Sequence, residues 1–390
     1  MAKLTDIIGK ALSGEWGTDD ETGDGIPVLR TTNFTNEGVV NYNDVVTRII
    51  TKKNIEEKYL RKGDIIIEKS GGSDKFPVGR VIYFDGEENT YLFNNFTGLL
   101  RVKNQDVWYP KYVFYSLFLN YKRGGTRAFE NKTTGLHNLK IEDYVSRYEV
   151  SEIARNEQVS ICEKLDKLFN VIKLRKQELQ LLDDLIKARF VEMFGDPILN
   201  PNGYLKEKIE KHIDLLTGYP FKSEQYIEEG INICGGLIIM PQKIKWNECV
   251  HWSSVEGFED YLLNENDIVM ALDRPWISEG FKMAKVDAEH LPALLIQRTA
   301  RIRAIDMNQD YLYYCFINGG FDKHSNVTGS LVPHISAKDI RSFEIMIPPT
   351  ELQKQFADFV HQVDKSKVAV QKALEQTQTL FDSLMQKYFG

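Results

Sequence analysis

Two carboxylates and a glycine-rich segment are the residues of this sequence that most resemble a catalytic site. Asp64 and Glu68 stand four residues apart, but a metal-dependent nuclease needs carboxylates that converge on one ion. Asp64 opens a strand-like run that the corresponding Asp267 also opens, which favours a structural turn at both places. We therefore predict a structural role for this pair, with a metal-dependent nuclease left open as an alternative.

Motifs for other chemistry do not occur in the sequence. Segment 71–79 lacks the G-x-x-x-x-G-K-[ST] spacing of a nucleotide-binding loop and is typical of a hairpin or flexible loop. The seven histidines do not recur at metal-ligand spacing, and no C-x-x-C pair occurs among the cysteines, which are Cys162, Cys234, Cys249 and Cys315. No Ser/His/Asp set and no Asn/Asp-Pro-Pro-aromatic methyltransferase site is visible. We expect no catalytic residue, metal or cofactor in this chain, and any chemistry to be supplied by a partner.

Clusters of basic and polar side chains stand at corresponding places in the two halves of the sequence. The first half holds them over 122–127 and 131–137, and the second half over 323–328. Arginines at 298, 301 and 303 alternate along a strand-like run. Arginine and lysine can neutralise phosphates, while Asn, Thr, Ser and His can contact base edges. For any single residue, a solvated surface is the alternative interpretation.

The sequence predicts two long helices, over about 152–193 and 351–389. Each follows one of the two regions that hold these clusters. The first contains no proline or glycine before Gly195, which is a natural helix end, and Pro197 follows. Apolar residues recur in steps of three, four or seven, the signature of a heptad seam. The predicted seam consists of Ile161, Leu165, Leu168, Ile172, Leu179, Leu182 and Ile186 in the first helix, and Phe356, Val360, Val363, Val370, Leu374, Phe381 and Leu384 in the second.

The polar positions of the two seams differ. Arg175 in the first helix corresponds to Val370 in the second, and Leu182 corresponds to Thr377. Each helix could therefore pack better against the other than against a copy of itself. We infer an antiparallel pair within the chain, with the alternative that each helix caps its own domain.

The whole sequence is an internal repeat. A shift by half of the 390 residues places Phe389 on Phe194 and Gln353 on Gln158 without a gap. Because the period is as long as a domain, it indicates a duplicated module. We predict an α+β fold of mixed helices and strands, with two pseudo-repeated domains joined by the two long helices about a pseudo-two-fold axis. The predicted boundaries are 1–150, 151–195, 196–347 and 348–390.

Composition sets wider limits. A chain of 390 residues predicts two or three domains. No apolar run reaches the roughly 18 residues of a membrane span, and the first residues lack the apolar core of a signal peptide. We expect a cytoplasmic protein that does not contact a membrane. The net charge of −7 argues against binding nucleic acid through the whole surface, so such contacts need local patches or a basic partner.

The sequence resembles the DNA-specificity subunit of type I restriction-modification systems over its whole length. The resemblance rests on the repeat itself and on particular runs, which are 25–34, 62–66, 68–73, 77–80, and Pro348-Pro349 followed by Glu351 and Gln353. In that family the last run usually reads Pro-Pro-Leu-x-Glu-Gln. This chain has Glu351-Leu352-Gln353 there, and its first copy keeps only Asn156-Glu157-Gln158, without the prolines.

The resemblance implies a subunit without catalysis that reads a split target in double-stranded DNA, one half-site for each recognition domain. It implies docking of two adenine-N6 methyltransferase subunits, and of two restriction and translocation subunits that can join them. S-adenosylmethionine, Mg and ATP would be bound by those partners. The paired helices would set the spacing: about 28 residues at 1.5 Å each give roughly 42 Å, or on the order of 12 base pairs at 3.4 Å. A coiled-coil scaffold for protein interaction is the main alternative.

Residues that face DNA are predicted from the same resemblance. In the first domain they are Arg30, Asn33, Lys69, Ser70, Gly71, Gly72, Ser73, Lys75, Asn94, Asn95, Arg127, Lys132, Thr133 and His137. In the second domain they are Arg274, Trp276, Ser278, Lys282, Gln297, Arg298, Lys323, His324 and Asn326. Glycine at Gly71-Gly72 would allow the backbone to approach the duplex closely.

Overall fold

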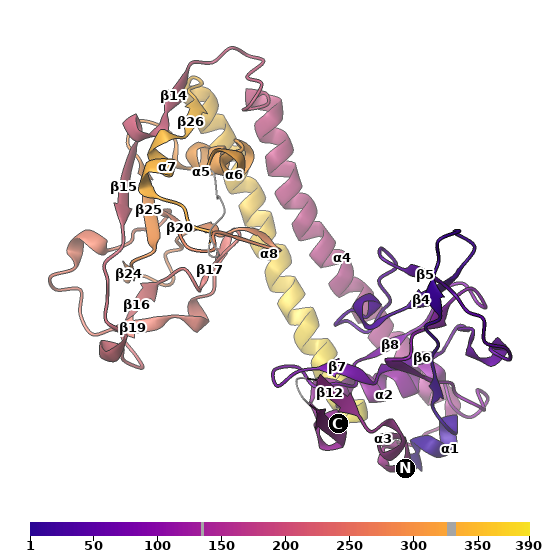
Figure 1. The fold of residues 1–390 in the computed structure, drawn as a ribbon. Helices are drawn as coiled ribbons and strands as arrows, with labels where there is room; N and C mark the ends of the chain where they lie inside the picture. Colours follow the sequence, from indigo (N-terminus) through magenta and orange to yellow (C-terminus); the bar gives the residue numbers. More distant parts are fainter. Residues whose placement is uncertain (134–135, 326–332) are drawn as a thin grey trace. The chain divides into compact units, whose positions relative to one another are not determined.

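The computed structural model describes residues 1–133, 136–325 and 333–390, without the side chains of Lys132, Thr133 and Leu136. The chain forms two compact units, one from Met1–Lys176 with Lys372–Gly390 and the other from Gln177–Gln371. Each unit contains one predicted recognition region and parts of both long helices (Figure 1). The predicted boundaries at 150, 195 and 347 separate elements along the sequence, whereas the compact units divide both helices between them.

The first unit combines short strands with helices. Its strands are β1 (Ala2–Lys3), β2 (Leu12–Ser13), β3 (Thr18–Asp19), β4 (Ile26–Leu29), β5 (Val46–Ile49), β6 (Ile65–Glu68), β7 (Ser70–Gly72), β8 (Val81–Tyr83), β9 (Leu92–Phe93), β10 (Thr97–Leu100), β11 (Glu130–Thr133), β12 (Leu136–Leu139) and β13 (Glu149–Val150). Its α-helices before the first long helix are α1 (Leu4–Ile8), α2 (Pro110–Lys122) and α3 (Ile141–Arg147).

The second unit follows the same plan. Its strands are β14 (Lys206–Lys208), β15 (Ile213–Thr217), β16 (Ile231–Cys234), β17 (Ile239–Met240), β18 (Lys243–Ile244), β19 (Val250–Trp252), β20 (Ile268–Ala271), β21 (Trp276–Ile277), β22 (Gly280–Phe281), β23 (Met283–Lys285), β24 (Ala293–Leu295), β25 (Thr299–Ala304) and β26 (Glu344–Met346). Its shorter α-helices are α5 (Gln309–Asn318), α6 (Phe321–His324) and α7 (Ala337–Ser342).

The sheets show that the two units share a scaffold. An antiparallel sheet has the order β2-β10-β6-β8 in the first unit and β15-β25-β20-β23 in the second. Strand β4 pairs in parallel with β9, as β16 does with β24. The additions differ: the first unit carries the sheet β11-β12-β7, and the described part of the second carries the hairpins β17-β18 and β21-β22. The mixed helix and strand fold and the internal repeat are therefore confirmed.

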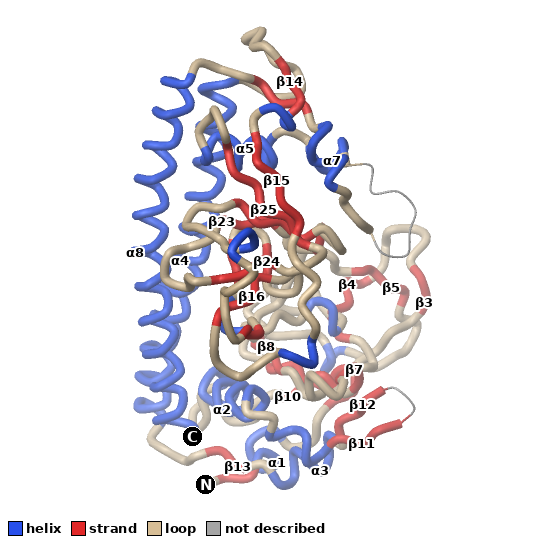
Figure 2. Tube along the Cα trace, turned by 90° about the vertical axis from the view of Figure 1, so that its left-hand side faces the viewer, coloured by secondary structure: helices blue, strands red, loops and turns tan. Residues whose placement is uncertain are grey.

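The two long helices are α4 (Arg155–Phe194) and α8 (Thr350–Phe389), and both run without a break (Figure 2). The ranges expected from the apolar periodicity agree with these bounds to within a few residues. In the first unit Arg175 of α4 contacts Ala373 and Thr377 of α8. In the second unit Phe190 packs on Phe356, while Lys367 lies 2.6 Å from Asp183. Within that unit the contacts advance along α4 and retreat along α8, so the two segments are antiparallel there.

All fourteen predicted seam residues are buried or half-buried. Several, including Leu165, Ile186, Phe356 and Val360, are fully shielded from solvent. The buried stripe of each helix is wider than the predicted seam, because the helix also packs against sheets and shorter helices of the units. The apolar periodicity therefore did not identify the buried Cys162, Phe190 and Met385.

The ends of the long helices explain the repeated phenylalanine. Phe194 packs on Tyr311 of α5 in the second unit, with ring centres 4.8 Å apart. The corresponding Phe389 packs on Tyr112 of α2 in the first unit at 4.9 Å. Each long helix therefore ends in the core of the unit in which the other one starts.

A buried glutamine fixes the start of each long helix. Gln158 accepts a hydrogen bond from the amide of Tyr109 (2.8 Å) and donates to the carbonyl of Val107 (3.0 Å). The corresponding Gln353 accepts from the amide of Asn308 (2.9 Å) and donates to the carbonyl of Pro348 (2.9 Å). The glutamine that survives in both copies of the repeat thus joins each long helix to the loop in front of α2 or α5.

Candidate nucleic-acid interface

In the first unit, the sheet β11-β12-β7 brings together several of the residues predicted to face DNA. Strand β7 pairs with β12, placing His137 opposite Gly72 and Asn138 opposite Ser70. Strand β11 pairs with the other side of β12, with Lys132 opposite His137. The backbones of segments far apart in the sequence therefore form one surface element.

A loop at 73–77 extends from this sheet. Arg127 donates to the carbonyl oxygens of Asp74 and Lys75, each at 3.2 Å. A Cβ on Gly72 would lie 2.5 Å from the amide nitrogen of Val78. The glycine is thus required for the loop to pack against its own chain, and Arg127 holds the loop in place. The side chains left on the exterior include Ser73, Lys75 and Phe76.

Three of the polar side chains predicted to face DNA in this unit are buried. Asn33 accepts from the amide of Arg30 and donates to two carbonyls, which satisfies the hydrogen bonds of a loop. The Nδ1 atom of His137 lies 3.0 Å from an oxygen of Glu130. Asn94 is 4% exposed. Because a shielded side chain cannot reach a base edge, we assign these three to packing. Arg30 is half-buried and pairs with Asp44 at 2.9 Å.

In the second unit an exposed charge cluster surrounds Asp273. One carboxylate oxygen of Asp273 lies 3.0 Å from Arg298, and the other lies 2.6 Å from Nδ1 of His334. Arg274 follows directly, and its amide donates to the carbonyl of Pro333. Gln297 and Arg298 occupy the exposed turn between β24 and β25. The structure thus brings Arg274, Gln297 and Arg298 to one part of the surface.

Other residues predicted for the second unit have local roles. Trp276 stacks on Phe281, with ring centres 4.8 Å apart, and Ser278 donates to the neighbouring Glu279. Lys282 is 7% exposed and donates to the carbonyl of Gly236, and burial lowers the pKa of its ammonium group. We therefore remove Lys282 from the expected DNA contacts.

The cluster predicted at 323–328 lies only partly within the described residues. Lys323 and His324 are exposed at the end of α6. The Nε2 atom of His324 lies 3.1 Å from the Ser342 hydroxyl and 3.1 Å from the Asp339 carbonyl of α7. Asn326 is outside the described residues, so its predicted role is not addressed by the structure.

The carboxylates considered for a nuclease are structural. Arg101 donates hydrogen bonds to both oxygens of Asp64, at 2.7 and 2.6 Å, and Asp64 also accepts from the amide of Arg61. Arg303 donates to both oxygens of Asp267 in the same way. Asp64 and Asp267 therefore fix the corresponding turn of each unit, as predicted. Glu68 pairs with Arg80 at 3.4 Å, and burial raises the pKa of its carboxyl group.

Arg301 and Arg303 each pair with a carboxylate of their own unit. Arg301 is buried and contacts Asp214, and Arg303 contacts Asp267. Of the three alternating arginines, only Arg298 has an exposed side chain. Within the described ranges, no group of three or more His, Cys, Asp or Glu side chains could hold a metal ion.

Comparison with known proteins identifies the family of this chain. Residues 1–183 and 218–377 match the "Type I restriction modification DNA specificity domain". The chain belongs to this family.

Two known specificity subunits are similar to this chain. The chain is 30% identical over 201 residues to the type I restriction enzyme EcoAI specificity subunit of Escherichia coli, and the aligned region covers 48% of this chain and 33% of that protein. It is 23% identical over 295 residues to the MjaVIII specificity subunit of Methanocaldococcus jannaschii, covering 69% and 68%. The chain thus spans about a third of the length of the E. coli relative.

Solved structures share the fold of the specificity chain. The crystal structure of a type I restriction-modification S subunit from M. genitalium matches with a TM-score of 0.58 at 15% identity, covering 100% of this chain and 95% of that one. A chain from a study of complex assembly and conformational transition of the type I R-M system matches with a TM-score of 0.52 at 14% identity, covering 100% and 96%.

Sequence reasoning about the specificity chain missed its most exposed aromatic side chains. Phe76 is 60% exposed and lies beside Lys75 in the loop of the first unit, and Phe96 is 52% exposed next to Asn95. Asp273 and His334 were also missed. The available signal was an aromatic residue next to proline or asparagine, since Pro77 follows Phe76 and Asn95 precedes Phe96, and both neighbours favour turns.

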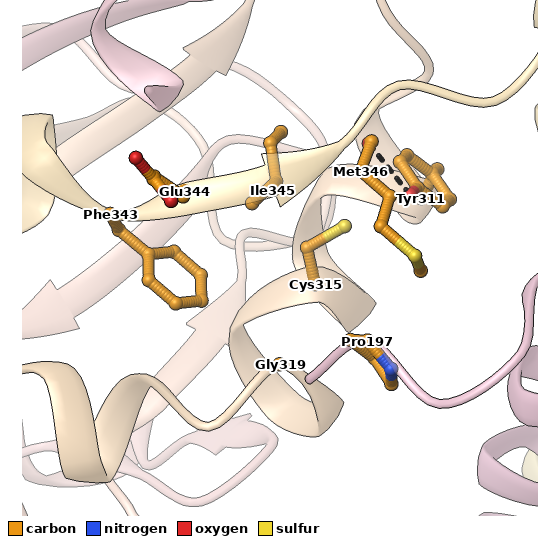
Figure 3. A pocket seen from close by; sticks show the side chains of 8 residues that line it. All are labelled: Pro197, Tyr311, Cys315, Gly319, Phe343, Glu344, Ile345 and Met346. Carbon is orange, nitrogen blue, oxygen red and sulfur yellow. Dashed lines mark hydrogen bonds between the residues drawn. The ribbon is translucent and has the colours of Figure 1, made fainter. Parts of the chain in front are cut away.

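A pocket in the second unit of the specificity chain offers no comparable chemistry. It lies between α5 and β26 and includes Tyr311, Cys315 and Phe343 in its lining (Figure 3). The hydroxyl of Tyr311 donates to the carbonyl of Met346 at 2.9 Å, and burial raises the pKa of the Cys315 thiol to about 12.

Among the helices of the described residues, none is long and apolar enough to cross a bilayer.

Proposed function

We propose that this chain is the DNA-reading subunit of a type I restriction-modification complex, and that each compact unit reads one half-site of a split target. The observation that carries this proposal is the repeated scaffold with different polar additions. The same four-stranded sheet occurs twice, but the first unit adds a sheet and a lysine-bearing loop while the second adds the Asp273 cluster. One task performed on two different sequences requires this combination.

The proposed contact surface combines exposed members of the predicted set with half-buried ones beside them. In the first unit the exposed members are Gly71, Ser73, Lys75, Asn95 and Arg127, and the half-buried ones are Lys69, Ser70 and Gly72, with the backbones of Lys132 and Thr133 in the same sheet. In the second unit the exposed members are Arg274, Gln297, Arg298, Lys323 and His324. Lysine and arginine would contact phosphates, and the amide and hydroxyl groups would contact base edges or sugars.

Methylation and cleavage would be the work of partner subunits. We propose that two adenine-N6 methyltransferase subunits dock on the long helices, and that two restriction and translocation subunits join them. S-adenosylmethionine, Mg and ATP would be bound by those subunits. The long helices would hold the recognition domains at a fixed spacing.

The acidic balance of the chain shapes its expected affinity. With a net charge of −7, the isolated chain should bind DNA weakly and with a steep salt dependence, since few phosphates are neutralised. The methyltransferase subunits would close around the duplex and add phosphate contacts. Titration of labelled DNA at several salt concentrations, with and without the partner, measures this; equal affinity in both cases would contradict it.

The decisive experiment is co-expression with the neighbouring methyltransferase subunit, followed by genome-wide mapping of methyladenine with and without this chain. We expect methylation at one split motif that disappears when this chain is absent. Unchanged methylation would favour the coiled-coil scaffold instead. Cleavage of DNA by the isolated chain with magnesium would favour a nuclease, although the arginine pairing of Asp64 argues against it.

A further inference from the structure

A turn of the same construction projects from each unit. It spans Asn94–Thr97 between β9 and β10, and 296–299 between β24 and β25. The hydroxyl of Thr97 donates to the carbonyl of Asn94 at 2.8 Å, and the hydroxyl of Thr299 donates to the carbonyl of Ile296 at 2.5 Å. Both threonines are fully buried. The two turns are therefore equivalent parts of the repeat, although their sequences, NNFT and IQRT, share only the threonine.

Each turn is fixed by the strands beside it. The carbonyl of Phe96 accepts from the amide of Lys69 at 2.7 Å, directly after β6. The carbonyl of Arg298 accepts from the amide of Leu272 at 2.9 Å, directly after β20. At the start of the first turn, the amide of Asn94 donates to the carbonyl of Leu29 at 2.9 Å, and at the start of the second the amide of Ile296 donates to the carbonyl of Cys234 at 3.3 Å. The backbone is thus bound on both sides of the exposed residue.

A glycine supports each turn from behind. A Cβ on Gly14 would lie 2.1 Å from the carbonyl oxygen of Asn94, and a Cβ on Gly218 would lie 2.1 Å from that of Ile296. No side chain fits in either place without moving the turn. The residue after each glycine is hydrogen-bonded to the strand that leads into the turn. The amide of Glu15 donates to the carbonyl of Phe93 at 2.8 Å, and the amide of Tyr219 donates to the carbonyl of Leu295 at 3.0 Å.

The exposed side chains of the two turns differ in chemistry. The first turn presents Asn95 and Phe96, and the second presents Gln297 and Arg298. Phe96 is 52% exposed. The side chain of Arg298 is 74% exposed, and Asp273 holds its guanidinium at 3.0 Å. The same hydrogen bonds hold both turns, but the tips differ in backbone as well as in side chain, because Arg298 has a φ of +63° and Phe96 does not have a positive φ. A repeated anchor that carries a different tip is what two readers of different sequences need.

We propose that these turns are base-reading tips, and that Phe96 and Arg298 are equivalent specificity-determining residues. This inference rests on the proposed DNA-reading function and deepens it. Arg298 would donate its two parallel N–H groups to O6 and N7 of a guanine in one half-site. Phe96 would make apolar contact with the methyl group of a thymine in the other half-site.

The test uses the complex of the full chain with its methyltransferase subunit. Once the wild-type motif is mapped, methylation rates are measured on DNA in which each position of both half-sites is randomised. We expect Arg298→Ala to lose roughly 10-fold to 100-fold of the discrimination at one guanine position. Phe96→Ala should lose a smaller factor, at one thymine position of the other half-site. Each variant should leave the other half-site unchanged.

Matched controls separate reading from general effects. Arg341→Ala removes an exposed arginine of α7 in the second unit, and Val107→Ala trims an exposed apolar side chain of the first; neither should alter the motif. Arg298→Lys keeps the charge but loses the paired donors, so the guanine preference should stay relaxed while overall DNA affinity recovers. Restored preference with lysine would overturn the assigned role.

The outcomes distinguish this inference from the function on which it rests. If the wild-type complex methylates no split motif, the proposed function itself fails. If it does, but Arg298→Ala and Phe96→Ala keep every position of the motif, only the tips are refuted. A uniform loss of affinity at all sequences, or loss of the methyltransferase subunit during purification, would equally refute base reading, because it would show a phosphate or a protein contact.

Discussion

Arg175 of α4 donates hydrogen bonds to the hydroxyl of Thr377 and to the carbonyl of Ala373 in α8. These two side chains are the polar exceptions to the apolar seam. Thr377 stands where the first helix has Leu182, and Arg175 stands where the second has Val370. Each departure from the repeat therefore meets the other, which favours pairing of unlike helices over pairing of like ones.

A double-mutant cycle tests this relationship. Thr377→Leu should destabilise the protein by about 1–3 kcal/mol, because it leaves the guanidinium of Arg175 without its hydroxyl partner. Adding Arg175→Val should recover most of that loss, giving a coupling energy of about 0.5–3 kcal/mol in chemical denaturation. Thr379→Leu, at an exposed site of the same helix, is the control. Additive effects would show that the two residues do not depend on each other.

The buried carboxylate and arginine pairs should be essential for stability. Asp64→Asn or Asp267→Asn leaves Arg101 or Arg303 unmatched and should lower the free energy of unfolding by about 3–5 kcal/mol. Asp44→Asn removes a partner of Arg30 whose side chain is 81% exposed, and should change it by less than about 1 kcal/mol. Denaturant titrations measure all three. A stable Asp64→Asn variant would return Asp64 to the list of functional candidates.

The helix-starting glutamines should protect particular amides from exchange. Gln158→Ala leaves the Tyr109 amide without its acceptor, and Gln353→Ala does the same to Asn308, each at a cost of about 1–3 kcal/mol. Hydrogen exchange should accelerate at those amides, whereas Gln180→Ala on the exposed face of α4 should leave them protected. Unchanged exchange in Gln158→Ala would show that other contacts hold the loop.

Thiol reactivity should follow burial. Burial raises the pKa of Cys162 and of Cys315 to about 12, so at pH 8 only about one thiol in ten thousand would be the reactive thiolate. Burial also raises the pKa of Cys249, but this thiol is only half-buried. Iodoacetamide labelling of the folded chain should therefore modify Cys249 first and accelerate as the pH rises. Early modification of Cys162, read by mass spectrometry, would contradict this order.

The repeat and the long helices could be predicted because they depend on patterns that lie along the sequence. Apolar spacing predicted the seam, and the matched Asp64 and Asp267 predicted corresponding turns, since local backbone geometry imposes both. The differing polar segments also predicted that the two units would carry different additions.

The burial of individual polar residues could not be predicted, because it depends on contacts that form only when separate segments of the folded chain meet. Asn33, His137 and Lys282 were read as surface residues, yet Asp44, Glu130 and Gly236 bind them in the fold. Phe96 was passed over for the opposite reason. An aromatic residue is expected in the core, and only the fixed turn reveals that it faces outward.

The division of both long helices between the units has a consequence for synthesis on the ribosome. The core of the first unit includes Phe381 and Met385 from α8 as well as Leu4 and Leu165. That core is complete only after the whole of the second unit has been translated. The second unit, whose residues are contiguous from Gln177 to Gln371, can close first. The part of the chain made earliest thus waits longest for its last packing partner, and until then its apolar surface is open to chaperones or to another copy.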